Sequence, residues 1–315
     1  MTNSIFFDFF VDIMPDLCYN DFVMKICVDN GNILIREIAD FKLKDIFDCG
    51  QCFRFNPDDK GGYIGTAYGK TVRIHQNEDC VILYNTTEKD FYDVWYLFLD
   101  LDRNYGRIKT KLTTNADSVM QEAIAYGEGI RILRQELWET IVSFIISASN
   151  NIPRIKKIIE LLCTNFGELH TYEGNTYYSF PDAHTIAGLT EDELSVIRAG
   201  FRTKYILNCA RLVASGEFDL AGLCNLPTID AKRELMKLSG IGNKVADCIL
   251  LFSLNRFDSF PIDVWIKRIM EYCYFGNVPQ SIQTISDFAY SRFGEFGGMA
   301  QQYLFYYARS LKIGT

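Results

Sequence analysis

The chain has 315 residues, 48% of them hydrophobic and 23% charged, and its seven prolines and ordinary composition exclude a low-complexity or disordered protein. Its formal net charge of −8 argues by itself against a nucleic-acid partner, because phosphate binding draws its affinity from lysine and arginine. A local surface can override the net charge of the whole molecule, so this class of partner stays open.

The first 24 residues are expected to form an N-terminal extension. Asp8 and Asp12 interrupt its apolar run and no basic segment precedes it, which disfavours a signal peptide, and Met24 is an alternative start. We expect no membrane partner, because the chain lacks a run of about 20 apolar residues. Ten irregularly spaced cysteines fit free thiols in a reducing compartment. The expected location is the cytoplasm, with the nucleoid, of a prokaryote or the nucleus of a eukaryote.

From residue 25 to about residue 87 the pattern is that of β-strands. Short apolar or alternating runs are separated by turn residues such as Asp29–Gly31 and Asp58–Gly62, which predicts an antiparallel sheet. The expected strands lie at Ile33–Ile35, Cys52–Phe55, Tyr63–Gly65, Val72–His75 and Val81–Tyr84.

From Glu88 onward the hydrophobic period becomes helical. The expected helices are Lys89–Phe98, Asp117–Ala125, Leu137–Ser149, Arg154–Phe166, Glu191–Ala199, Thr203–Ser215, Asp230–Lys237, Asn243–Phe252, Val264–Tyr274 and Met299–Leu311. The fold class is therefore α+β, with a sheet domain over residues 25–130 and a helical domain over residues 131–315.

The most informative segment is a glycine-rich turn between two helices, a hairpin at about residues 231–252. Gly240 and Gly242 permit a tight turn and the close approach of another backbone. The turn also leaves free N–H groups at the start of the second helix, which form a phosphate site without basic residues. Such a site partly answers the objection raised by the acidic net charge.

Two side chains near this turn have the chemistry of a catalytic pair. Lys244 opens the second helix of the hairpin, and a lysine with a lowered pKa can form a Schiff base. Asp263 follows Pro261 and is expected to cap the helix that starts at Val264, which fixes its carboxylate. The residues alone leave open an ordinary hairpin with a solvated lysine and a capping aspartate.

The combination resembles a known superfamily. Leu238, Gly240, Gly242 and Lys244, followed by Pro261 and Asp263, are similar to the helix-hairpin-helix Gly/Pro-Asp DNA glycosylases. The stretch Gly242–Cys248 resembles the 8-oxoguanine DNA glycosylase/lyase family in particular. That resemblance implies an N-terminal antiparallel β-sheet domain followed by two all-helical subdomains. It also implies a bifunctional enzyme that excises 8-oxoguanine from duplex DNA, opposite cytosine, and cleaves the abasic site by β-elimination.

The resemblance assigns the catalytic roles and the partners. Lys244 becomes the nucleophile that attacks the sugar C1′, and Asp263 stabilises the charge that develops on the sugar. The hairpin at Gly240, Gly242 and Val245 binds the DNA backbone. No cofactor is required, although hairpin carbonyls in this superfamily can hold a structural cation. The enzyme is expected to act as a monomer, and the absence of cysteines after Cys273 disfavours the iron–sulfur branch.

Four residues are implied to form the pocket for the extruded base. The carbonyl of Gly50 would accept a hydrogen bond from N7–H, which 8-oxoguanine has and guanine lacks. Gln301 would bond the Watson–Crick edge, while Phe305, four residues later and on the same helix face, stacks on the base. Cys248 would form the opposite wall of the stack. Without the resemblance, Phe305 and Cys248 are better explained as core residues.

Cys49 and Cys52 also form a CxxC pattern, which can indicate zinc or redox chemistry. No second ligand pair accompanies them and the chain has three histidines, so we expect no metal site.

A further set of residues is implied to fill the gap in the duplex and to contact the opposite base. The set is Ser149, Asn150, Asn151, Arg154, Phe201 and Arg202. Arg154 and Arg202 would donate to cytosine, although contact with phosphate is almost as well supported. Better-known members have Asn in place of Ser149, Tyr in place of Phe201 and His in place of Trp265, which leaves opposite-base selectivity open.

Three other functions compete with this prediction. One is a non-catalytic DNA-binding module that uses the hairpin alone, which the presence of both Lys244 and Asp263 disfavours. Another is a glycosylase for other damaged purines, which would not need a lysine at position 244. The last is an α+β protein that binds phosphate at the turn and releases no base.

Overall fold

The computed structural model describes residues 24–114 and 117–311. Of the predicted N-terminal extension, residues 1–24, all but Met24 lie outside the described residues, so the choice between Met1 and Met24 as the start stays a prediction.

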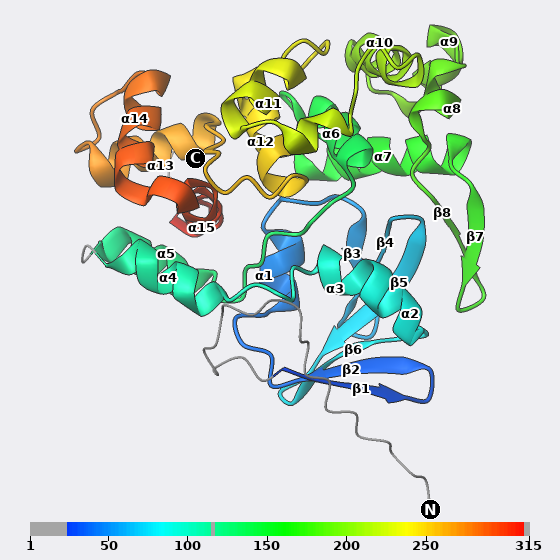
Figure 1. The fold of residues 1–315 in the computed structure, drawn as a ribbon, viewed down its shortest axis with the longest axis horizontal. Coiled ribbons are helices and arrows are strands. Elements are labelled where there is room, and N and C mark those ends of the chain that lie inside the picture. The colour runs from blue at the N-terminus through cyan, green and yellow to red at the C-terminus, as the bar shows by residue number, and fades with distance from the viewer. Residues whose placement is uncertain (1–23, 115–116, 312–315) are drawn as a thin grey trace, which may run out of the picture.

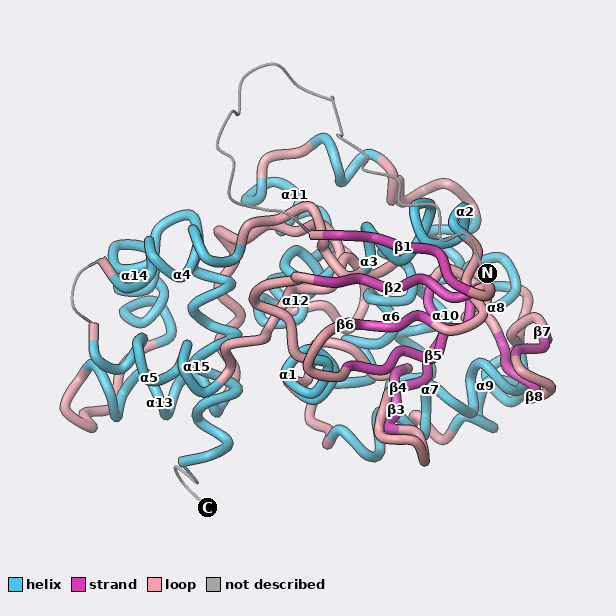
Figure 2. Tube along the Cα trace, turned by 90° about the horizontal axis from the view of Figure 1, so that it is seen from below, coloured by secondary structure: helices cyan, strands magenta, loops and turns pink. Residues whose placement is uncertain are grey.

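The predicted antiparallel sheet is confirmed. Among the described residues, six strands pair in the order β1-β2-β6-β5-β4-β3, as Figure 2 shows. The strands are β1 (Lys25–Asp29), β2 (Asn32–Arg36), β3 (Phe55–Pro57), β4 (Tyr63–Ala67), β5 (Lys70–Gln76) and β6 (Cys80–Leu83). Ile33 lies opposite Leu83 and Ile35 opposite Val81, and all four side chains are buried, so the register gives the sheet one apolar face.

A helix that the sequence analysis did not predict, α1 (Leu43–Asp48), packs on that face. The ring of Phe47 stacks on that of Phe55 at 4.4 Å between centroids. The strand predicted over Cys52–Phe55 is wrong for its first three residues, because the chain leaves α1 through a left-handed Gly50 and pairs only from Phe55.

The helical pattern predicted from Glu88 is also confirmed, with small shifts at helix ends. The helical elements are α2 (Glu88–Asp90), η1 (Phe91–Trp95), α3 (Tyr96–Phe98), α4 (Tyr105–Thr113), α5 (Ser118–Tyr126), α6 (Leu137–Ser147), α7 (Ile152–Phe166), α8 (Ala183–Ala187), α9 (Glu191–Leu194), η2 (Ser195–Ile197), α10 (Arg202–Ala214), η3 (Gly222–Asn225), α11 (Thr228–Leu235), α12 (Asn243–Phe252), α13 (Val264–Tyr274), α14 (Ile282–Phe293), η4 (Gly294–Phe296) and α15 (Gly297–Leu311). Helices α4, α8 and α14 were not predicted.

The helical part also carries a two-stranded hairpin, β7 (Leu169–Tyr172) and β8 (Asn175–Tyr178), that extends along the sheet domain (Figure 1). The Tyr172 hydroxyl accepts a hydrogen bond from the Arg73 amide at 3.1 Å and donates to the Tyr84 carbonyl at 2.8 Å. Arg73 and Glu173 form an ion pair at 2.6 Å. The hairpin therefore fastens the helical part to strands β5 and β6.

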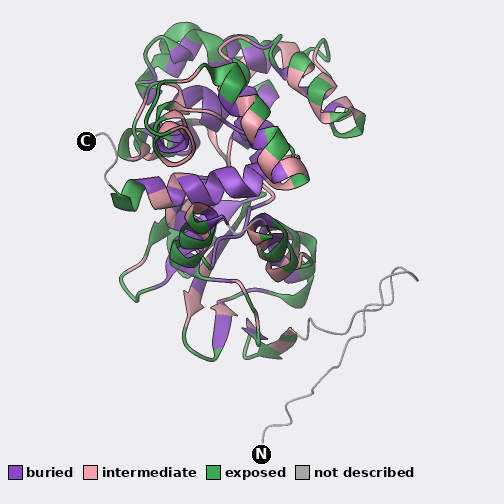
Figure 3. Cartoon of the chain, turned by 90° about the vertical axis from the view of Figure 1, so that its left-hand side faces the viewer, coloured by how far each residue is buried: buried purple, intermediate pink, exposed green. Residues whose placement is uncertain are grey.

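Helix α15 lies between the two parts and is buried along most of its length, as the helix leading to the C-terminal mark in Figure 3 shows. The Gln302 side chain donates to the Cys49 carbonyl at 2.9 Å, and the Tyr306 hydroxyl lies 3.4 Å from an Asp45 carboxylate oxygen. Helices α4 and α5 contribute Ile108 and Met120 to the helical core rather than to the sheet core. Both residues precede residue 130, so the two hydrophobic cores do not divide at that residue. The predicted domain boundary there stays a prediction.

Within the described ranges, no helix is both long enough and apolar enough to cross a membrane.

The Tyr172 contact gives a test of how the two parts are joined. Replacing Tyr172 with Phe should lower the free energy of unfolding by about 1–3 kcal/mol, because the Arg73 N–H and the Tyr84 carbonyl lose a buried partner. Urea denaturation measures the change. The matched variant Tyr177→Phe, on the neighbouring strand, should change stability by less than about 0.5 kcal/mol. Equal losses in the two variants would contradict this role.

Candidate active site

The hairpin between α11 and α12 has the predicted glycine geometry at one position and a different geometry at the other. Gly240 has φ 84°, and a Cβ there would lie 2.7 Å from Cδ2 of Tyr205, so the turn requires glycine at that residue. Gly242 is extended, with φ −98°, and a Cβ there would meet no atom within 4 Å. The space outside Gly242 is therefore open to a ligand.

The two hairpin helices are joined by an ion pair. Lys232 of α11 lies 2.8 Å from Asp247 of α12, and both side chains are largely buried. Burial raises the pKa of Asp247 to about 6, while the charge of Lys232 opposes that rise. The pair fixes the direction in which α12 begins.

The start of α12 is available to an anion. Gly242 is its N-cap and supplies no side-chain oxygen, so the first amides, including those of Lys244 and Val245, have no intrahelical acceptor. The Val245 side chain is buried in the core, so only its backbone faces this site. The partial positive charge of a ten-residue helix acts at the same place.

The structure brings Lys244, Cys248 and Asp263 together. The Lys244 ammonium lies 5.3 Å from the centre of the buried Phe144 ring. Burial raises the pKa of the Cys248 thiol to about 11, the Lys244 charge lowers it, and the charges of Asp247 and, less strongly, Asp263 raise it. Lys244 and Asp263 therefore both act on one thiol. The sequence analysis missed Phe144, because nothing distinguishes it within the apolar run of α6.

Asp263 caps α13 as predicted. Its Oδ1 accepts a hydrogen bond from the Ile266 amide at 2.8 Å, which fixes the carboxylate beside the start of the helix. Pro261, which cannot sit inside a helix, precedes it in the extended segment.

Two of the predicted base-pocket residues, Gly50 and Phe305, lie close together where α15 passes the end of α1. Gly50 has φ 85°, and a Cβ there would lie 3.2 Å from Cε1 of Phe305. Gln301 is 5% exposed, and its Oε1 is buried without a hydrogen-bond partner among the described residues. Helix α15, which carries both side chains, packs on α12, where a Cβ at Gly298 would meet Leu251 at 2.5 Å. This unpaired oxygen is therefore available as an acceptor for a ligand.

The turn between α6 and α7 holds three of the predicted gap-filling residues. The Asn150 side-chain amide donates to the Ile146 carbonyl at 3.0 Å, and the Asn151 side chain caps α7. Ser149 has φ 51°, a left-handed conformation that Asn adopts more readily than Ser. The substitution seen in the sequence therefore falls on a strained backbone position.

The predicted opposite-base arginines differ in their surroundings. Arg202 is 3% exposed, and its guanidinium donates to the carbonyls of Ala148 at 3.0 Å and Ser149 at 3.1 Å, which lie in the same turn. Arg154 is exposed. Burial lowers the pKa of Arg202, and the charge of Arg154 lowers it further by a smaller amount. Phe201 is 60% exposed and stacks on the Arg202 guanidinium at 4.4 Å. Donation to a cytosine stays a prediction for both arginines.

The CxxC cysteines are buried thiols. Burial raises the pKa of Cys49 to about 12 and raises that of Cys52 as well. In the part of the chain that the structure describes, no group of three or more His, Cys, Asp or Glu side chains is placed to hold a metal ion.

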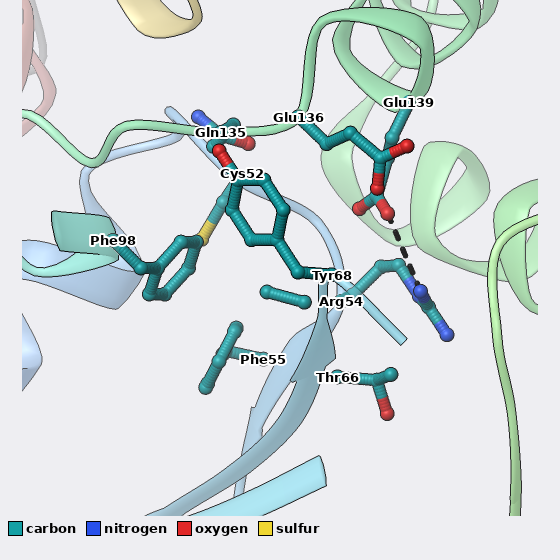
Figure 4. A pocket seen from close by; sticks show the side chains of 10 residues that line it. Cys52, Arg54, Phe55, Thr66, Tyr68, Phe98, Gln135, Glu136 and Glu139 are labelled. Carbon is teal, nitrogen blue, oxygen red and sulfur yellow. Dashed lines mark hydrogen bonds and ion pairs between the residues drawn. The ribbon is translucent and has the colours of Figure 1, made fainter. Parts of the chain in front are cut away.

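A small cavity of about 10 Å³ lies between the sheet domain and α6, apart from the candidate site (Figure 4). Cys52, Tyr68 and Gln135 are among its lining residues, and Arg54 pairs with Glu139 there at 3.3 Å. Burial raises the pKa of Glu139 to about 7, against the opposing charge of Arg54.

Comparison with known proteins gives consistent matches over most of the chain. Residues 33–141 match the family model of the 8-oxoguanine DNA glycosylase N-terminal domain, and residues 142–289 match that of the HhH-GPD superfamily base excision DNA repair protein. An N-glycosylase/DNA lyase of Saccharomyces cerevisiae is 32% identical over 78% of this chain and 71% of its own length.

Two solved structures are also similar. One, MBOgg1 in complex with a low-affinity DNA ligand, has a TM-score of 0.89 and 45% identity and covers 92% of this chain and 100% of that one. The other is an 8-oxoguanine glycosylase/lyase of Clostridium acetobutylicum bound to double-stranded DNA with cytosine opposite 8-oxoG. Its TM-score is 0.87 with 40% identity, covering 92% of this chain and 99% of that one.

The raised pKa of Glu139 predicts a pH-dependent stability. The folded protein binds this proton more tightly than the unfolded chain, whose carboxyl titrates near 4.5, so this group makes the free energy of unfolding fall as pH rises from 4.5 to about 7. Glu139→Gln removes that contribution. Urea denaturation across this window should show that the free energy of unfolding of the variant rises relative to that of the wild type as pH rises. A difference between the two free energies that does not change with pH would contradict the raised pKa.

Proposed function

The chain belongs to the 8-oxoguanine DNA glycosylase family, and on that basis we propose that Lys244 is the amine through which it works. It is a base-excision repair enzyme, a DNA glycosylase/lyase that removes 8-oxoguanine and cleaves the abasic site. The observation that carries the proposal for Lys244 is its place in the first turn of α12, where its charge and that of Asp263 both act on Cys248.

Binding of the substrate begins at the hairpin. The free amides at the start of α12 donate hydrogen bonds to a DNA phosphate, which orients the DNA backbone and places the sugar of the extruded nucleotide beside Lys244. The extruded base enters the pocket at Gly50, Gln301 and Phe305. The buried, unpaired Oε1 of Gln301 supports a polar contact with the base edge, because such an atom is costly when it stays unpaired.

The chemistry then proceeds by nucleophilic substitution. The Lys244 ammonium first loses a proton, and the amine then attacks C1′ so that a C–N bond forms. The bond from C1′ to the base breaks, and the base leaves with the electron pair and takes up a proton. Asp263, fixed as the α13 cap, stabilises the positive charge that develops on the sugar. Ring opening gives a Schiff base, loss of a C2′ proton expels the 3′ phosphate, and hydrolysis frees the amine.

The opposite base, the oligomeric state and the location of the enzyme are further parts of the proposal. We propose that cytosine is the favoured opposite base, since Arg154 is exposed beside the gap-filling turn. We also propose a monomer that requires no cofactor and no membrane, with hairpin carbonyls able to hold a structural cation. Residence with the DNA, in the cytoplasm or the nucleus, follows from the substrate.

Trapping the intermediate tests Lys244. Borohydride reduction on duplex DNA with one 8-oxoguanine should give a covalent adduct with the wild type and none with Lys244→Gln, because an amide side chain cannot form a Schiff base. Lys237→Gln is the matched control, since Lys237 lies on the same hairpin but pairs with Glu234 at 2.7 Å. It should be trapped like the wild type.

The other outcomes separate the competing functions. Base release without an adduct in the wild type would mean a monofunctional glycosylase and a wrong assignment of Lys244. Binding of DNA with neither release nor adduct would favour the non-catalytic module.

Because Asp263 caps a helix, a substitution can remove its charge and still keep the cap. Asp263→Asn should slow base release by roughly 10²–10⁴-fold while leaving the melting temperature nearly unchanged, because asparagine caps a helix about as well as aspartate. Single-turnover kinetics and thermal melting measure the two effects. Asp182→Asn removes the same charge from the cap of α8 and should leave the rate unaltered. A normal rate in Asp263→Asn would contradict the catalytic role.

A further inference from the structure

The three consecutive backbone carbonyls that follow α1, those of Cys49, Gly50 and Gln51, differ in their hydrogen bonding. The Cys49 carbonyl accepts a hydrogen bond from the Gln302 side-chain amide at 2.9 Å. The Gln51 carbonyl accepts one from the Gln135 side-chain amide at 2.8 Å. Between them, the carbonyl of Gly50 receives no hydrogen bond from any described residue. Two glutamines from distant segments therefore bind the peptides on either side and leave the middle acceptor unused.

The side chain of Gln51 holds the same stretch from a third direction. It is fully buried, and its Nε2 donates to the carbonyls of Ile46 and Arg131, each at 2.8 Å. Its Oε1 accepts a hydrogen bond from the Leu133 amide at 2.9 Å. Both amide protons and the oxygen are thus satisfied by backbone groups, one in α1 and two in the segment that precedes α6.

That segment is itself rigid, so it is a firm support for Gln51. The Arg131 side chain is fully buried and donates to the carbonyls of Ala39 and Asp100 at 2.9 and 2.8 Å. The Ile132 amide donates to the Tyr105 hydroxyl at 2.8 Å. Side chains locked by packing and by further hydrogen bonds hold a binding group within the tolerance that recognition needs.

We propose that Gln51, Gln135 and Gln302, which we name the glutamine clamp, are positioning residues that aim the Gly50 carbonyl at the lesion. The inference rests on the proposed function, in which Gly50 accepts a hydrogen bond from N7–H of 8-oxoguanine. The hydrogen bonds of the clamp side chains all go to backbone groups, and none goes to Lys244. The clamp acts through Gly50, whose backbone is left-handed and where a Cβ would lie 3.2 Å from Phe305 and 3.7 Å from Ile152.

The clamp matters because a Gly50 carbonyl oxygen that is free to move forms a weaker hydrogen bond to the base. A carbonyl that accepts one hydrogen bond discriminates only while it stays in line with the donor, since the bond weakens steeply with the angle. Removing one clamp amide allows its peptide to rotate and also frees a carbonyl to accept competing donors. The clamp should therefore affect release of the lesion base more than steps that need no base in the pocket.

The experiment compares two activities of the same protein. Gln135→Met and Gln302→Met each remove one hydrogen bond while keeping the side-chain length. Gln51→Met is avoided, because it would leave three buried backbone groups unpaired. For each variant, single-turnover release of 8-oxoguanine is divided by the rate of cleavage of a preformed abasic site. Loss of the hydrogen bond should lower this ratio roughly tenfold, equivalent to about 1.4 kcal/mol.

The matched control is Gln76→Met. Its side chain makes the same kind of contacts to backbone, with the Phe41 carbonyl at 2.8 Å and the Leu43 amide at 2.9 Å, but at the start of α1 rather than at its end. It should lose stability without changing the ratio. A ratio unchanged in Gln135→Met or Gln302→Met, whichever of the two folds, would overturn the clamp. A wild type that releases no 8-oxoguanine would instead overturn the proposed function.

Discussion

The proposed base pocket depends on the position of one peptide, that of Gly50, between α1, α15 and the segment before α6. Gly50 has to approach Phe305 on α15 closely, with a left-handed backbone, while its neighbours are bound by amides from α15 and from the segment before α6. The sheet domain, which carries Gly50, is tied to the helical part by this junction and by the β7–β8 hairpin. These contacts, which lie outside the α11–α12 hairpin, thus support the position of the Gly50 carbonyl.

The two groups proposed to be catalytic share a second constraint, because each lies at the start of a helix. Lys244 lies in the first turn of α12 and Asp263 caps α13, so the helix starts fix both groups without dedicated basic or acidic neighbours. Backbone amides at a helix start bind phosphate through partial charges. A protein with a net charge of −8 can therefore bind DNA through its backbone at this point.

The chemistry could be predicted from the sequence because its signals are local. Lys244 and Asp263 lie in short motifs, and the strands from β4 to β6 have clear alternation and turn residues. The glutamine clamp could not be predicted, since Gln51, Gln135 and Gln302 become neighbours only through the fold. The same applies to Phe144 under Lys244. The buried guanidinium of Arg202, bonded to the Ala148 carbonyl, also depends on tertiary packing.

The most direct test of the account is a binding measurement with Lys244→Gln, which leaves the pocket intact and forms no Schiff base. Its affinity for a duplex with 8-oxoguanine opposite cytosine is compared with that for the analogue in which a C–H group replaces N7–H. If the Gly50 carbonyl reads this proton, the analogue should bind roughly tenfold more weakly, as expected for one lost buried hydrogen bond. Equal affinities would contradict the account.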